Sequence, residues 1–203
     1  DELKEKVLTT IKDFSTKNLN EFDSYFRYSN LVHQIDMTDR SITNNVTKIN
    51  MINEKVILLG GAAQYKFGFN NQIKKGTLKS IGVQVSGSQN YWYVEETDTY
   101  DGNLNFYSFD LNNKKIYTNN IKGTIDYNTG LVTVQDIIIE NVESGTNNNF
   151  RMEAEPVSFD IFPKRNQILL IDPNDVTITM DADSEEYNNN YDITTQNVQI
   201  IRR

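Results

Sequence analysis

The single histidine of the chain, His33, is the first residue whose type and spacing could support chemistry. It lies three residues before Asp36 and close to Asp39. On a helix, a carboxylate at that spacing could orient the imidazole, which is how a general base is positioned for nucleophilic catalysis. No serine stands in a nucleophile-elbow sequence, so the pattern favours a structural histidine near a helix end. A hydrolase that uses His33 or a pair of the 28 acidic residues stays open as an alternative.

Acidic residues gather in two places where oxygen atoms could bind a hard cation. These are Asp172 with Asp175, and the cluster Asp181, Asp183, Glu185 and Glu186. The cluster alternates as an EF-hand loop does but lacks the glycine of its sharp turn, so solvated loop charge is favoured. The chain has no cysteine and one histidine, which excludes thiolate and multi-imidazole metal sites. We predict no metal, no cofactor and no catalytic residue.

The glycine pair Gly60-Gly61 is the only motif that approaches a phosphate-binding loop. It lacks the GxxxxGK[ST] and GxGxxG spacings, and no helical pattern follows it. Because a phosphate cradle needs backbone amides aimed by a turn that leads into a helix, we interpret this segment as a loop that joins two strands.

The run Tyr91-Trp92-Tyr93, with Tyr100 nearby, contains rings on which a sugar could stack. Strand alternation places Tyr91 and Tyr93 on one face and Trp92 on the other. Burial in the core is the favoured interpretation of these rings. An exposed aromatic set in a protein–protein interface is the main competitor.

The elements that would position these residues begin with a helical region. Apolar residues at steps of three and four predict an amphipathic helix over residues 2–17. A second helix is predicted from Ser29, as its N-cap, to Asp36. Between the two helices, Phe22, Tyr25 and Phe26 are interpreted as packing residues.

From about residue 41 the apolar period changes to two, which predicts a succession of strands. The alternating runs are residues 47–51, 65–69, 81–85, 91–94, 104–111, 121–127, 150–154, 168–171 and 176–180. The turn signal Tyr127-Asn128-Thr129-Gly130 predicts a hairpin over residues 121–134. The acidic, polar segment 181–192 is predicted to be a loop.

Strands that follow one another without intervening helices indicate an α+β fold, with two N-terminal helices followed by a mostly antiparallel sheet or sandwich. The predicted organisation is a helical segment over residues 1–40, an antiparallel β domain over 41–180, and a polar acidic loop with a C-terminal tail over 181–203.

Charge and hydropathy limit the class of partner. The net charge is −8, so the chain is a poor partner for nucleic acid, whose binding depends on Lys and Arg. Residues 1–80 carry 12 Lys and Arg against 9 Asp and Glu, whereas the remainder is acidic, which favours head-to-tail or heteromeric contacts. No apolar run approaches the roughly 18 residues of a membrane span. We therefore expect neither a membrane nor a secreted protein.

Three stretches, in order, resemble baseplate wedge proteins of contractile-tailed bacteriophages. The first runs from Glu21 through Phe26-Arg27-Tyr28-Ser29 to Asn44, the second is Gly123-Thr124-Ile125-Asp126-Tyr127-Asn128-Thr129-Gly130-Leu131-Val132, and the third is Ser158-Phe159-Asp160-Ile161-Phe162-Pro163 with the residues up to Leu169. The family is the ring-forming wedge subunit of T-even-type phages, related to baseplate J-like proteins. Because family members are longer, we expect this chain to be the C-terminal portion of a larger protein.

The resemblance implies a structural virion protein of the tail baseplate, without catalysis and without a small-molecule substrate. It implies a homodimer that joins neighbouring wedges into the inner baseplate ring, with other wedge subunits as partners and assembly in the host bacterial cytoplasm. The absence of cysteine agrees with a reducing compartment. If the dimer exists, we expect its contact on an apolar strand face within residues 91–111 or on the first helix. The alternative function is a carbohydrate-binding β module of a phage tail that uses Trp92 or the face of Tyr91 and Tyr93.

Overall fold

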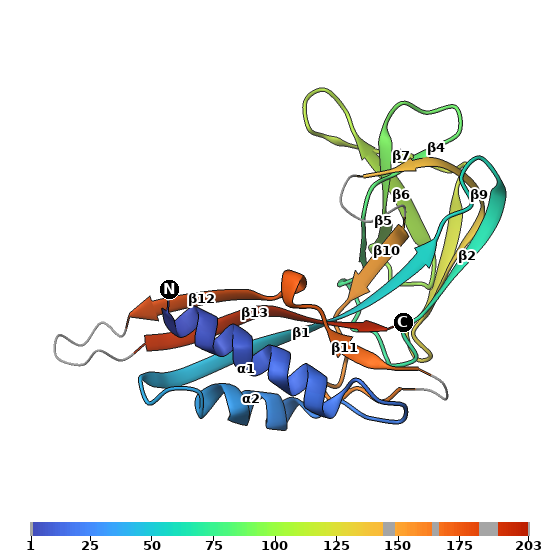
Figure 1. Ribbon diagram of the computed structural model, residues 1–203. Coiled ribbons are helices and arrows are strands. Elements are labelled where there is room, and N and C mark those ends of the chain that lie inside the picture. The colour runs from blue at the N-terminus through green and yellow to red at the C-terminus, as the bar shows by residue number, and fades with distance from the viewer. Residues whose placement is uncertain (1, 144–148, 164–166, 183–190, 203) are drawn as a thin grey trace. The chain divides into compact units, whose positions relative to one another are not determined.

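A computed structural model describes residues 2–143, 149–163, 167–182 and 191–202 of the chain (Figure 1). The chain divides into two compact units. Unit 1 combines residues 1–51 with residues 158–203, and unit 2 is the continuous stretch 52–157. This division does not follow the predicted boundaries at residues 40 and 180. The C-terminal strands belong with the N-terminal helices, a pairing of distant segments that composition along the chain does not reveal.

Unit 1 begins with α1, Glu2–Asn18, which confirms the predicted first helix. Its apolar stripe is buried at Val7, Ile11 and Phe14, and acidic side chains occupy its first turn, where they favour the helix dipole. The helix packs against α2 and against two C-terminal strands of the same unit. Its apolar face is therefore used inside the fold, which argues against α1 as a dimer contact.

The second helix, α2, spans Tyr28–Asp36. The predicted N-cap at Ser29 is wrong, because the helix already begins at Tyr28 and Arg27 is the N-cap residue without a side-chain cap. The Tyr28 N–H instead donates to Asp160 Oδ1 at 3.0 Å. This N–H has no partner within the helix, and a residue 132 positions later in the sequence supplies one.

The remaining elements of unit 1 are strands and one short 3-10 helix. They are the N-terminal part of β1 (Ile42–Val56), then β11 (Leu169–Ile171), the 3-10 helix Pro173–Asp175, β12 (Thr177–Ala182) and β13 (Tyr191–Arg202). Strand β13 pairs antiparallel with β12 over residues 191–196 and with β11 over residues 200–202. The prediction of a loop and tail over 181–203 is wrong at 181–182 and 191–202, and residues 183–190 lie outside the described residues.

Unit 2 is built from antiparallel strands. Its seven-stranded sheet has the order β2-β9-β4-β5-β6-β7, with β8 also paired to β9. The strands are β2 (Ala62–Gly68), β4 (Val83–Val85), β5 (Tyr91–Glu96), β6 (Leu104–Phe109), β7 (Lys115–Thr118), β8 (Lys122–Asp126) and β9 (Leu131–Val142). Two further strands, β3 (Lys79–Ser80) and β10 (Asn149–Ala154), pair with each other.

The predicted hairpin over residues 121–134 is confirmed by the pairing of β8 with β9, which closes at Asp126 and Leu131. The Asp126 carboxylate accepts the N–H groups of Asn128 and Thr129 at 2.9 and 3.2 Å. Gly130 adopts φ +68°, a left-handed conformation that favours glycine. Local turn chemistry thus fixes this hairpin.

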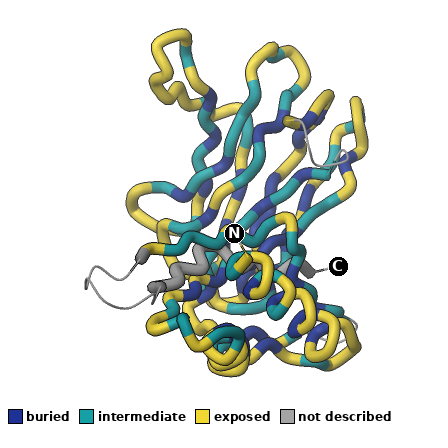
Figure 2. Tube along the Cα trace, turned by 60° about the vertical axis from the view of Figure 1, so that its left-hand side comes forward, coloured by how far each residue is buried: buried dark blue, intermediate teal, exposed yellow. Residues whose placement is uncertain are grey.

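The core of each unit is formed by apolar residues of the predicted helix and strand patterns, on the side of each element that faces inward. In unit 2 the strands alternate between buried and accessible residues, as Figure 2 shows along the tube, and the buried rings include Phe67, Phe106 and Phe150. Phe150 meets Phe67 edge-on with ring centroids 5.1 Å apart. The two helices followed by antiparallel strands confirm the α+β class.

Candidate interaction surfaces

His33 and its neighbouring carboxylates do not form a catalytic pair in the structure. His33 and Asp36 are both exposed on α2. Asp39 is engaged elsewhere, because its Oδ1 accepts the N–H and the hydroxyl of Ser41 at 3.1 and 3.0 Å and its Oδ2 meets Lys6 Nζ at 3.3 Å. These hydrogen bonds hold the pKa of Asp39 below its usual value, with the Ser41 N–H as the main cause. Asp39 therefore fastens the α2–β1 turn to α1.

The acidic clusters likewise serve local structure where they are described. Asp172 caps the short 3-10 helix by accepting the Asn174 N–H at 2.9 Å. Asp181 belongs to β12, while Asp183, Glu185 and Glu186 lie outside the described residues. Within the described ranges, no group of three or more His, Asp or Glu side chains is placed to hold a metal ion.

The glycine pair Gly60-Gly61 lies in the turn between β1 and β2, as predicted for a loop that joins strands. Gly60 adopts φ +70°, and its N–H donates to the Ile139 carbonyl of β9 at 2.9 Å. This amide is already used in the fold, which fits a structural turn.

The prediction that the aromatic run of β5 is buried in the core is wrong. Val94 is buried, but Tyr91, Trp92 and Tyr93 are only half-buried. Strands β6 and β7 extend the same face as Tyr93, because Tyr93 pairs with Tyr107 and Tyr107 pairs with Tyr117. We call the surface formed by the rings of Tyr93, Tyr107, Phe109 and Tyr117 the tyrosine face.

The rings of the tyrosine face are packed against one another. Tyr93 stacks on Tyr107 with ring centroids 5.6 Å apart, and Phe109 meets Tyr107 edge-on at 5.5 Å. Such contacts leave the rings ordered before any partner binds. Phe109 and Tyr117 retain 40% and 57% of their exposure, so the outer half of the face is open to solvent.

A Lys–Glu pair fixes the outer edge of the tyrosine face. Lys115 Nζ lies 4.0 Å from the centroid of the Tyr107 ring and is also paired with Glu95, whose other oxygen accepts the Tyr117 hydroxyl at 2.9 Å. The hydrogen bond to Glu95 raises the pKa values of both Lys115 and Tyr117. Burial raises the pKa of Tyr107. The tyrosines are thus neutral hydroxyl donors at physiological pH.

A second group of exposed rings lies in unit 1. Tyr25 and Phe162 stack with centroids 5.6 Å apart, and Tyr28 packs on Phe159 at 4.9 Å. The Arg27 guanidinium lies 5.1 Å from the centroid of the Tyr25 ring. We call these five residues the aromatic cluster; its exposed rings, Tyr25, Phe159 and Phe162, are 44%, 45% and 55% accessible.

The aromatic cluster is held by a bridge between two segments that are far apart in the sequence. Phe26 and Ile161, both fully buried, exchange backbone hydrogen bonds of 2.9 Å in each direction. The predicted packing role is confirmed for Phe26, which is buried, and for Tyr25, which stacks on Phe162 while 44% exposed. It is wrong for Phe22, which is 66% exposed. Sequence reasoning missed this cluster because hydrophobicity does not reveal which side of an irregular segment faces solvent.

Glu96 is a buried carboxylate behind the tyrosine face. It is 8% exposed and accepts the N–H groups of Gly76, Thr77 and Leu78, and its Oε1 has no hydrogen-bond partner among the described residues. Burial raises its pKa despite these N–H donors. The carboxylate fastens the segment that leads into β3 to the end of β5.

We expect the raised pKa of Glu96 to make the stability of unit 2 depend on pH. The folded protein binds the proton of the Glu96 carboxyl group more tightly than the unfolded chain does. The stability that this proton contributes is therefore fully present below the unfolded pKa and is lost as pH rises through the folded pKa. As the pH falls from 7 to 5, the free energy of unfolding of the wild type should therefore increase relative to that of Glu96→Gln, by at most about 1.4 kcal/mol per pH unit. Urea unfolding followed by Trp92 fluorescence measures this difference, and a difference that stays constant with pH would contradict the assignment.

The N-terminal part of the chain matches a model of a known family. The family model described as "Baseplate structural protein gp6, C-terminal domain III" matches residues 1–54. This stretch contains both helices, part of the aromatic cluster and most of β1. The match supports a structural role in a phage tail baseplate, in contact with other baseplate subunits.

No curated protein matches the chain. Among the helices of the described part, none has both the length and the apolar character that a membrane crossing requires.

Proposed function

We propose that the chain is a non-catalytic assembly module of a baseplate wedge, which dimerises and joins neighbouring wedges in the inner ring of a contractile tail. The observation that carries the proposal is that the aromatic cluster, a set of ordered exposed rings, lies partly on the segment that matches a baseplate structural domain. Stable association needs preformed shape, aromatic anchors and complementary charge, and it needs no reactive group.

The aromatic cluster supports contact with another wedge subunit. Its rings are fixed by stacking and by the buried Phe26–Ile161 bridge, so that binding would cost little side-chain entropy. Arg27 and the aromatic rings are residue types enriched in the central contacts of interfaces. We infer that a partner subunit covers Tyr25 and Phe162.

The tyrosine face supports the homodimer contact, in keeping with the expectation of a strand face within residues 91–111. The rings of Tyr93 and Tyr107 are half-buried and Phe109 is exposed, which leaves an ordered apolar surface on β5 and β6. Lys115 and Glu95 beside them carry opposite charges, so a second copy can present complementary charges to both.

The dimer is tested by sedimentation equilibrium of the chain over a range of concentrations. We expect reversible dimerisation that Phe109→Ala combined with Tyr117→Ala weakens by at least about thirtyfold, which corresponds to about 2 kcal/mol for two central contacts. Leu111→Ala is the matched control, since Leu111 is fully exposed in the turn that joins β6 and β7 and lies outside the tyrosine face. A strict monomer at high concentration, or a dimer that the double substitution leaves unchanged, would contradict the dimer contact.

The wedge contact is tested with sibling wedge proteins from the same phage as binding partners. Phe162→Ala should weaken their binding by at least about tenfold, whereas Met37→Ala, at an exposed position of unit 1 outside the cluster, should not. Failure of all sibling proteins to bind the wild-type chain would remove this part of the proposal and leave the dimer as a separate question.

A further inference from the structure

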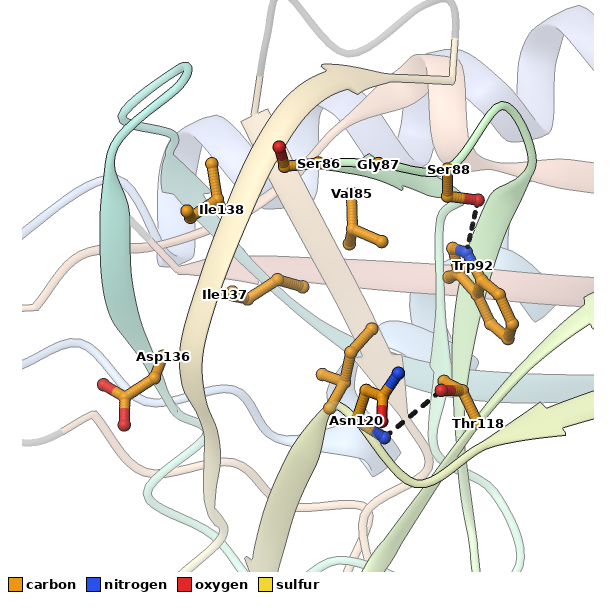
Figure 3. Close-up of a pocket in the computed structure, with 11 residues that line it drawn as sticks. Val85, Ser86, Gly87, Ser88, Trp92, Thr118, Asn120, Asp136, Ile137 and Ile138 are labelled. Carbon is orange, nitrogen blue, oxygen red and sulfur yellow. Dashed lines mark hydrogen bonds between the residues drawn. The ribbon is translucent and has the colours of Figure 1, made fainter.

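Unit 2 contains an open pocket of about 430 Å³ beside the only tryptophan of the chain. Three segments line it: the β4–β5 turn with Trp92, the β7–β8 connection at Thr118–Ile121, and residues 136–138 of β9 (Figure 3). The volume is within the range of small-molecule sites. Because Trp92 points to the side of the sheet opposite Tyr93, the pocket is separate from the tyrosine face.

A break in strand pairing creates this pocket. Strand β2 occupies one edge of β9, and β8 and β4 follow each other along the other edge. Pairing with β8 ends at Gln135 and pairing with β4 begins at Ile139, so neither strand pairs with Asp136 or Ile137. The sheet is therefore open at the point where the pocket lies.

The backbone of β9 is irregular at the same point. The register with β2 shifts by one residue between Val134 and Ile137, and Asp136 adopts φ +43°. A non-glycine residue in this conformation carries a conformational cost, and such bulges re-aim side chains next to functional sites. At this bulge Ile137 points into the pocket, whereas the Asp136 carboxylate is directed away from Trp92 (Figure 3).

The pocket combines an apolar floor with a polar rim. The apolar part consists of Val85, Ile121, Ile137 and the Trp92 ring. The polar part consists of hydroxyl and amide groups from Ser86, Thr118 and Asn120. The Trp92 Nε1–H donates to Ser88 Oγ at 2.9 Å (Figure 3). Ser88 Oγ also accepts the Asn90 N–H at 3.2 Å. The indole is thus held in one orientation while its own donor is satisfied, so that its ring surface is what it offers to a ligand.

We propose that this pocket binds one saccharide unit of a glycan. A pyranose ring has an apolar C–H face and a rim of hydroxyl groups, which is the same division of chemistry that the pocket presents. The C–H face would lie against Trp92, and the hydroxyl groups would meet Asn120 and Thr118 on the opposite wall. An aliphatic side chain from a partner protein would match the floor but leave these rim groups desolvated without hydrogen bonds, which is unfavourable.

Trp92 is also the reporter for the test, because its fluorescence comes from the pocket alone. The full chain is titrated with trisaccharides of glucose, galactose and N-acetylglucosamine and with core oligosaccharide from bacterial lipopolysaccharide. We expect a saturable change with at least one probe and a dissociation constant of about 1 mM or lower, as a single ring of this size allows.

Substitutions decide whether the pocket is the site of binding. Asn120→Ala, in an exposed connection, should weaken binding at least about fivefold, and Trp92→Ala should abolish the heat of binding measured by calorimetry. Leu111→Ala is the matched control, since Leu111 is fully exposed and lies outside both the pocket and the tyrosine face. The proposal would be overturned if all four probes failed to bind or if binding survived Trp92→Ala. It would also be overturned if a wedge protein changed the Trp92 fluorescence and none of the saccharides did. None of these outcomes depends on the dimer or on the wedge contact.

Discussion

Replacement of Phe26 by alanine should destabilise unit 1 by about 3–5 kcal/mol. Phe26 is fully buried, meets Phe14 edge-on with ring centroids 6.0 Å apart, and bridges to Ile161 through its backbone. The substitution would remove a whole ring from the junction of α1 with the segment before β11. Since both helices belong to unit 1, urea unfolding followed by circular dichroism at 222 nm measures this loss.

Phe22→Ala is the matched control for Phe26→Ala. The two phenylalanines are four residues apart in the same connection, but Phe22 is 66% exposed, so its truncation should change stability by no more than about 0.5 kcal/mol. If the two variants lost similar stability, the assignment of Phe26 as the buried member of the pair would be wrong.

The second large effect is expected at Gly130, in the turn between β8 and β9. Alanine there would adopt φ +68° and would place its Cβ 2.2 Å from the Asn71 carbonyl oxygen. The conformation alone costs roughly 1–2 kcal/mol, and the contact is with backbone, which cannot rotate away as a side chain can. We expect Gly130→Ala to destabilise unit 2 by about 3 kcal/mol or more, measured as a lower urea midpoint of Trp92 fluorescence.

Gly87→Ala separates the cost of the left-handed backbone conformation from the cost of the steric contact with Asn71. Gly87 also has a positive φ, +79°, but a Cβ there would meet no atom within 4 Å. Its substitution should therefore show the conformational cost alone, roughly 1–2 kcal/mol. Equal losses at Gly130 and Gly87 would mean that Asn71 does not approach the turn as closely as described.

The parts of the fold that local signals specify could be predicted from the sequence. The first helix follows from the spacing of Val7, Ile11 and Phe14, and the β8–β9 hairpin follows from its turn residues. The start of α2 could not be predicted, because its N–H partner Asp160 is 132 positions away in the sequence. Strand β13 was missed for a similar reason, since only its pairing with β11 and β12 shows where it belongs.

The candidate surfaces were predictable only in part. Alternation placed Tyr93 and Trp92 on opposite faces of one strand, and this is confirmed. It could not show that neither face would be fully covered, because coverage depends on how β4, β6 and β9 surround the strand. The stacking of Tyr25 on Phe162 joins two irregular segments, for which no periodicity exists to read.

The assembly of unit 1 from residues 1–51 and 158–203 has a consequence for synthesis on the ribosome. The helices emerge before unit 2, whereas β11 and β12, against which α1 packs, emerge only after the whole of unit 2. At bacterial translation rates this delay is on the order of ten seconds, long enough for unit 2 to fold alone. During that interval the apolar stripe of α1 lacks its covering strands, so the nascent chain should depend on chaperones until β11 and β12 arrive.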